Sequence, residues 1–145
     1  MIGTRSVPSD TLLAHLAYDD VGAAADWLIL NFAAEELFRY GGEPPQGVQM
    51  RIANAVVMLA KARPGRLNPK TAGGWTQTLS VFIDNVEQLH ASLAAAGVTL
   101  PEPLNETAYG ELQFVAEDPE GHRWLFARHV RDVDPRDWGA VTRTS

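Results

Sequence analysis

Apolar residues in the first part of the chain follow two different periods. Residues 11–20, TLLAHLAYDD, form an apolar run that ends in an Asp pair, as is typical of a buried strand that leads into a helix. Apolar residues then recur every three or four positions, which predicts a helix capped by Asp19 or Asp20. These residues are Val21, Ala24, Ala25, Leu28 and Phe32. Further strands are predicted at 35–42, 47–53 and 55–62, the last two as a hairpin.

The same order of patterns begins again after residue 74. A strand-like run at 75–86 precedes a second helical stretch, which Gly97 ends. The apolar stripe of that helix consists of Val86, Leu89, Leu93 and Ala96. Three more strand-like runs follow, at 98–104, 111–118 and 122–129, and DPEG between the last two predicts a tight turn with Gly121 at positive φ. The chain is therefore predicted to be an α+β protein that repeats a β-α-β-β-β unit.

These patterns divide the chain into segments. They are an N-terminal extension (1–10), a first βαβββ module (11–62), a linker loop (63–74), a second βαβββ module (75–129) and a C-terminal tail (130–145). The linker is assigned because RPGRLNPKTAGG is rich in Pro, Gly and cationic residues. The tail is polar, and its Trp138 is expected to fold back onto the domain or a partner subunit, unless the tail is frayed.

Composition narrows the classes of partner. With 145 residues, 46% of them hydrophobic, the chain suits one globular domain or two small modules that share a core. Its net charge of −6 repels polyphosphates, so nucleic acid is not expected as a partner. The lack of cysteine excludes disulfides and thiolate metal sites. No stretch resembles a signal peptide or a membrane span, and the expectation is a soluble cytoplasmic protein without a membrane partner.

Five segments in this order resemble one superfamily. They are AYDDVGAAADWL, IANAVVMLA, VFIDNVEQLHASLAAAGV, AYGELQF and EDPEGHRWLF. Together they are similar to the vicinal oxygen chelate superfamily of glyoxalases, bleomycin-resistance proteins and ring-cleaving dioxygenases, over residues 11 to 128, and most of all to its glyoxalase-like branch. The resemblance implies two βαβββ modules that form a curved mixed sheet around a cleft, with helices on the outer face. It also implies a small-molecule ligand and a homodimer.

In enzymes of this superfamily, four inward side chains hold a divalent metal. The four positions fall on Leu13, Met58, Thr78 and Leu125 in this chain. Divalent metals are bound by imidazole, carboxylate or thiolate groups, which these residues do not supply. We therefore expect no metal and no cofactor. We expect Leu13, Met58 and Leu125 to give apolar contact to an organic ligand, and Thr78 to help orient it by a hydrogen bond.

Other residues are candidates for the same cleft. His15 shares the strand face of Leu13, as Arg123 shares that of Leu125, because side chains alternate along a strand. His15 and Ser80 are expected to orient a ligand by hydrogen bonds, and Arg123 by charge. Trp75 and Tyr109 stand where loops meet strands and offer flat surfaces for stacking, with structural packing as the alternative.

Three further aromatic or imidazole residues are expected in the core or at the surface. Trp124 and Phe126 have the opposite parity to Leu125 and are expected in the core under a helix. His122, the first residue of the last predicted strand, is expected at the surface.

These observations favour a metal-independent binding protein that sequesters a planar or amphipathic compound. The first alternative is a lyase, isomerase or dioxygenase of the superfamily that uses His15 as a base or as the centre of a displaced metal site. The second alternative is an interaction domain whose cleft is filled by its own side chains.

Overall fold

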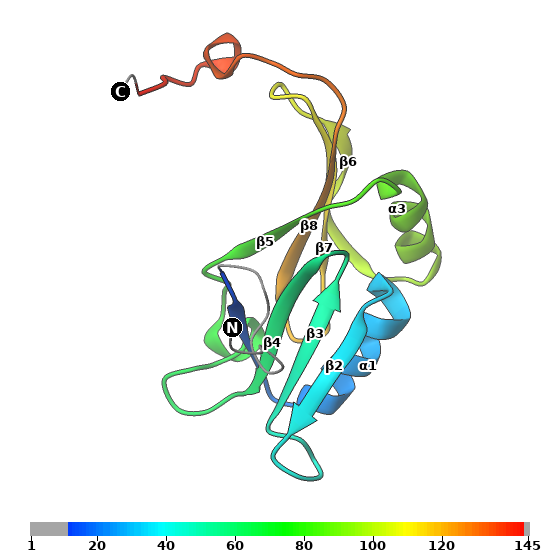
Figure 1. The fold of residues 1–145 in the computed structure, drawn as a ribbon, viewed down its shortest axis with the longest axis vertical. Coiled ribbons are helices and arrows are strands. Elements are labelled where there is room, and N and C mark those ends of the chain that lie inside the picture. Colours follow the sequence, from blue (N-terminus) through cyan, green and yellow to red (C-terminus); the bar gives the residue numbers. More distant parts are fainter. Residues whose placement is uncertain (1–11, 144–145) are drawn as a thin grey trace, which may run out of the picture. The chain divides into compact units, whose positions relative to one another are not determined.

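The computed structural model describes residues 12–143, which divide into two compact units. Of the described residues, unit 1 contains 12–77 together with Pro119–His122, and unit 2 contains Thr78–Asp118 and 123–143. Each unit holds one β-α-β-β-β module (Figure 1). The predicted extension at 1–10 lies outside the described residues. No helix within residues 12–143 is long and apolar enough to cross a membrane.

The first module forms its own mixed sheet. Its elements are β1 (Ala14–Tyr18), α1 (Val21–Phe32), β2 (Glu35–Tyr40), β3 (Gly47–Ile52) and β4 (Ala55–Lys61). Within the described residues the strand order is β1-β4-β3-β2, with β1 parallel to β4 and the other pairs antiparallel. The parallel pair is possible because α1 and two strands separate β1 from β4 in sequence.

A capping aspartate marks the start of helix α1, and a residue in the left-handed conformation marks its end. The carboxylate of Asp20 accepts the backbone N–H of Ala23 at 3.0 Å, which satisfies a free donor in the first turn. At the other end Ala33 takes a left-handed conformation, with φ of 55°. The buried residues of α1 are the five that the sequence pattern predicted: Val21, Ala24, Ala25, Leu28 and Phe32.

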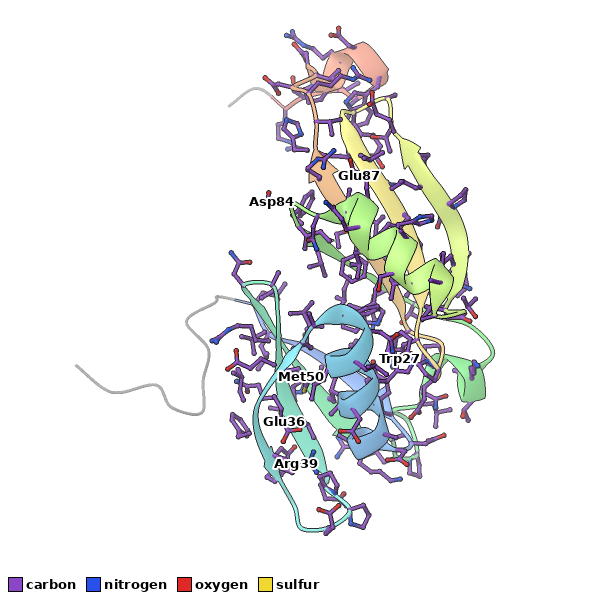
Figure 2. All side chains as sticks on the ribbon, turned by 90° about the vertical axis from the view of Figure 1, so that its right-hand side faces the viewer. Trp27, Glu36, Arg39, Met50, Asp84 and Glu87 are labelled. Atoms are coloured by element: carbon purple, nitrogen blue, oxygen red, sulfur yellow. The ribbon has the colours of Figure 1, made fainter. Side chains whose placement is uncertain are left out.

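Between α1 and the sheet lies the core of the first module. Val48, Met50 and Ile52 alternate along β3 and are almost fully buried. Helix α1 packs on β3 and β4, and Met50 lies beneath this helix (Figure 2). Residues of the opposite parity therefore lie on the sheet face away from α1, which we call open face 1.

The second module repeats this architecture. Its elements are β5 (Thr78–Phe82), α3 (Val86–Ala95), β6 (Thr99–Glu106), β7 (Glu111–Glu117) and β8 (Arg123–His129), and the strand order within the described residues is β5-β8-β7-β6. Strand β5 is parallel to β8. Phe114, Trp124 and Phe126 are buried, and α3 packs on β6, β7 and β8. The sheet face away from α3 is called open face 2.

The α+β class and the repeated module are thus confirmed, with differences in detail. In the predicted linker, Pro69–Ala72 forms a short helix, α2, which Asn68 caps by accepting the N–H of Thr71 at 2.8 Å. Ala96, expected in the helical stripe, is exposed because α3 ends at Ala95. In the tail, Pro135–Trp138 forms a 3-10 helix, and Trp138 lies against Tyr109 with ring centroids 5.5 Å apart.

The prediction for His122 was wrong. It is 7% exposed, its Nε2 lies 2.7 Å from the carbonyl oxygen of Ala17, and its ring packs on Tyr18 at 4.6 Å between centroids. The tight turn at Gly121, with φ of 97°, directs His122 inward into unit 1 rather than outward. The core prediction for Trp124 and Phe126 is confirmed, because each is at most 1% exposed.

Candidate functional site

The open faces carry the candidate residues, and strand register places them side by side. In open face 1, His15 is the partner of Met58, Met58 of Gln49, and Gln49 of Phe38. Partner residues on neighbouring strands share a face, so these four side chains form one row across β1, β4, β3 and β2. We call it row 1. Leu13 lies just before β1, two residues from His15, and is half-buried.

Row 1 has exposed ends and a buried middle. His15 is exposed and Phe38 is half-buried, whereas Met58 is 8% and Gln49 is 2% exposed. The thioether of Met58 adapts readily to the shape of an apolar partner. Sequence reasoning placed His15 and Met58 on one face, as the structure does, but it did not single out Gln49.

Beside row 1 lies a second row, which consists of three small residues and a tyrosine. Ala17, Ala60, Gly47 and Tyr40 are successive register partners. A Cβ on Gly47 would lie 2.3 Å from Cε1 of Tyr40, so the tyrosine ring lies directly over the glycine. Gly47 is therefore needed for a close approach and not for a turn.

Open face 2 is built in the same way with different chemistry. Ser80, Leu125, Val115 and Glu102 are successive register partners across β5, β8, β7 and β6, and we call them row 2. The neighbouring row contains Thr78, Arg123 and Glu117. Thr78 and Ser80 are exposed, and Leu125 is half-buried.

Charge on open face 2 is largely paired. Nη2 of Arg123 lies 3.1 Å from Oε1 of Glu117, its register partner, and both side chains are mostly buried. An anionic ligand at Arg123 would share the guanidinium with this carboxylate. On the same face, Phe82 is 61% exposed, which is more than the other apolar residues of β5. The sequence patterns did not single out this residue.

Trp75 and Tyr109 lie elsewhere. Trp75 lines a pocket of about 100 Å³ in unit 1, together with Leu67, Pro69 and His122. Tyr109 precedes β7, where it packs on Trp138 and donates a hydrogen bond to Oε1 of Gln113 at 3.2 Å. The structure thus brings together His15 and Met58 on one face, and Thr78, Ser80, Arg123 and Leu125 on another, and it places the two aromatic residues at loops.

The four superfamily metal positions do not suit a metal. Leu13 and Leu125 have no donor atom, Met58 offers a weak thioether and Thr78 a neutral hydroxyl. Within residues 12–143 no three His, Asp or Glu side chains come together as a ligand set. The four positions expected from the resemblance thus offer no imidazole or carboxylate ligand.

Resolved pKa shifts lie outside the two rows. Arg39 donates two hydrogen bonds of 2.8 Å to Glu36 and lowers the pKa of that carboxyl, against a smaller opposing effect of burial (Figure 2). Arg128 does the same for Glu87 at the start of α3, where it lowers the pKa of the carboxyl. These pairs stabilise local structure and do not form a catalytic acid and base.

Comparison with known sequences identifies the family. A family model described as Glyoxalase/Bleomycin resistance protein/Dioxygenase superfamily matches residues 11–126. The uncharacterized protein Rv0887c of Mycobacterium tuberculosis is 31% identical over 132 residues, which cover 85% of this chain and 76% of that protein. The uncharacterized protein Mb0911c of Mycobacterium bovis is also 31% identical and is covered over 86% of its length.

Solved structures show the same fold. TioX from Micromonospora sp. ML1 is 28% identical, with a TM-score of 0.67 over 84% of this chain and 100% of that one. Lactoylglutathione lyase from Agrobacterium tumefaciens is 16% identical, with a TM-score of 0.63 over 83% of this chain and 94% of that one. The fosfomycin resistance protein FosX from Listeria monocytogenes is 15% identical, with a TM-score of 0.62 over 83% and 93%. The match to the family model and the 31% identical relatives show that this chain belongs to the Glyoxalase/Bleomycin resistance protein/Dioxygenase superfamily.

Proposed function

We propose that this protein is a metal-independent small-molecule-binding member of its superfamily, a cytoplasmic homodimer that sequesters a planar or amphipathic compound. Each open face, taken by itself, is a binding surface for such a compound. Leu13, Met58 and Leu125 supply apolar contact, and polar side chains fix the orientation of the compound. The polar group consists of His15, Thr78, Ser80 and Arg123.

One feature of the sequence carries this proposal: the positions where the resemblance implies metal ligands hold Leu13, Met58, Thr78 and Leu125. Exchanging imidazole and carboxylate for leucine and methionine removes the charge that a cation needs and adds apolar surface. Such surface binds the carbon skeleton of an organic molecule. Phe82, exposed on open face 2, and Phe38, at the end of row 1, support the same ligand chemistry.

A second candidate has its own supporting observation. Met58 and Gln49 in the middle of row 1 are nearly inaccessible to solvent in a single chain. Burial of this kind is expected of an interaction domain whose face is filled by its own side chains. In the first candidate, contacts with a ligand replace the internal contacts of open face 1. In the second candidate, the internal contacts remain.

The test combines metal analysis with thermal unfolding. The purified protein is analysed for bound metal by mass spectrometry, and its unfolding midpoint is measured with Ni²⁺, Zn²⁺ or Fe²⁺ and then with planar aromatic compounds. A ligand that binds only the native state raises the midpoint. We expect no stoichiometric metal, no shift with the ions and a shift with at least one aromatic compound.

Variants separate the outcomes. Met58→Ala and Leu125→Ala should weaken binding of that compound, whereas Leu30→Ala, at an exposed position on α1, should not. One tightly bound metal per chain would contradict the proposal. A protein that binds neither metal nor aromatic compounds would instead support the filled-face candidate. Sedimentation velocity of the same sample tests the dimer.

A further inference from the structure

Gln49 differs from the residues around it. It lies in the middle of β3, between Val48 and Met50 of the core layer, and points to open face 1. Its side chain is 2% exposed, and its Oε1 has no hydrogen-bond partner in the part of the chain that the structure describes. Buried polar atoms are nearly always hydrogen-bonded in folded proteins, so this atom requires an explanation.

The neighbours in row 1 leave that oxygen without a donor. Met58 has no N–H or O–H group in its side chain, and neither has Phe38. Arg51, two residues along the same face, is directed to Glu35, with Nη1 3.6 Å from the carboxylate. The register partners of Gln49 thus offer its Oε1 no donor, and an unmade hydrogen bond at a buried atom is destabilising.

The second module shows that the fold does not need a glutamine here. Val115 occupies the position in β7 that Gln49 occupies in β3, because each is the register partner of its module's last-strand residue, Leu125 or Met58. Val115 is buried like Gln49, at 3% exposure. The same architecture therefore accepts an apolar residue at the equivalent position of the second module.

We propose that Gln49 is the polar anchor of open face 1 and accepts a hydrogen bond from an O–H or N–H group of the bound compound. This inference rests on the proposed function and narrows its ligand class to molecules with an apolar, flat body and a hydrogen-bond donor at one edge. The apolar body packs on Met58 and Phe38, and the donor reaches Oε1 of Gln49 between them. A compound whose donor is blocked leaves the oxygen unsatisfied and binds less tightly.

A matched pair of probes isolates this hydrogen bond. 2-Naphthol carries an O–H donor, and 2-methoxynaphthalene has the same aromatic body without the donor. Dissociation constants are measured by isothermal titration calorimetry for the wild type, Gln49→Met and Gln88→Met. Gln88→Met is the control, because Gln88 is exposed on helix α3 and lies on neither open face.

We expect the wild type and Gln88→Met to bind 2-naphthol about tenfold more tightly than the methoxy compound. In Gln49→Met this preference should disappear, mainly through weaker binding of 2-naphthol. If both compounds bind and the preference is absent from the wild type or survives in Gln49→Met, this inference is overturned while the proposed function stands. If neither compound binds the wild type, the proposed function fails for planar ligands and the inference fails with it.

Thermal unfolding without ligand gives an independent readout. Methionine has nearly the same volume as glutamine and removes the unsatisfied oxygen, so Gln49→Met should unfold at the wild-type temperature or above it. A midpoint several degrees lower would mean that the amide has an internal partner, and it would overturn the inference whatever the probes do.

Discussion

Oε1 of Glu120 accepts a hydrogen bond from the backbone N–H of Asp19 at 2.5 Å, although 101 positions separate the two residues in sequence. Oε2 of the same carboxylate accepts the N–H of Asp20 at 3.1 Å, and Nδ2 of Asn68 donates to Oε1. The tight turn that carries Glu120 thus joins unit 1 at the start of α1 and beside α2.

Removing this carboxylate should destabilise unit 1. In Glu120→Ala the N–H groups of Asp19 and Asp20 and the amide of Asn68 lose their acceptor, and a loss of about 1 to 3 kcal/mol in the free energy of unfolding is expected. Urea unfolding followed by circular dichroism measures it. Glu43→Ala, at an 82% exposed side chain, is the control and should change little. Equal stabilities of the two variants would show that the three hydrogen bonds add nothing net.

Trp124 should be among the most sensitive core positions. It is fully buried, and its Nε1 donates to Oδ2 of the buried Asp118 at 3.1 Å. Trp124→Phe removes this donor and leaves a void, so a loss of about 2 to 4 kcal/mol is expected. Trp138→Phe, at a half-exposed ring in the tail, should lose far less. The free energy of unfolding of both variants is measured by urea unfolding. Similar losses in the two variants would mean that burial does not determine how sensitive these two positions are.

Gly47 and Tyr40 should be energetically coupled. A methyl group at residue 47 would displace the Tyr40 ring, which is half-exposed and free to rotate away, so Gly47→Ala should lose only about 1 kcal/mol of overpacking energy. In a Tyr40→Ala background the same substitution should be neutral or slightly stabilising, because alanine suits a strand better than glycine. A double-mutant cycle measures the coupling. Additive effects would mean that the ring is not the obstacle.

The pair of Glu36 and Arg39 predicts a pH dependence. Because Arg39 lowers the pKa of Glu36 below its ordinary value of 4.5, the folded state releases this proton more readily than the unfolded state. The resulting stabilisation is fully present above pH 4.5 and is lost as the pH falls through the lowered pKa. Wild type should therefore be more stable than Glu36→Gln near neutral pH, and the difference should shrink toward pH 3. Glu102→Gln, at an exposed position on β6, is the control and should show a flatter difference.

The fold was predictable from sequence because its signals are local. Period-two and helical patterns marked the strands and α1, and Pro119 with Gly121 marked the turn whose φ of 97° the structure shows. The helical period was less decisive at the end of α3, where Ala96 continues the stripe although the helix stops before it. Residue parity also placed Trp124 correctly in the core.

Long-range contacts were not predictable in the same way. Nothing near His122 in sequence indicates that its imidazole reaches the carbonyl of Ala17, and nothing near Glu120 indicates Asp19. The candidate site was recovered in part, since His15 and Met58 do share a face. Gln49 was missed because its significance depends on the missing partner, which only the three-dimensional arrangement reveals.

Because the module is repeated, equivalent positions in the two halves of the chain can be compared. At positions facing the helices both halves keep apolar residues, as in the pairs Val48 and Phe114 or Leu59 and Phe126, each fully or almost fully buried. At positions facing away, the pairs have diverged in chemistry, with Gln49 opposite in kind to Val115 and His15 replaced by Ser80. The repeat thus keeps apolar side chains where each module packs its core, while the faces away from the helices differ in chemistry between the two halves.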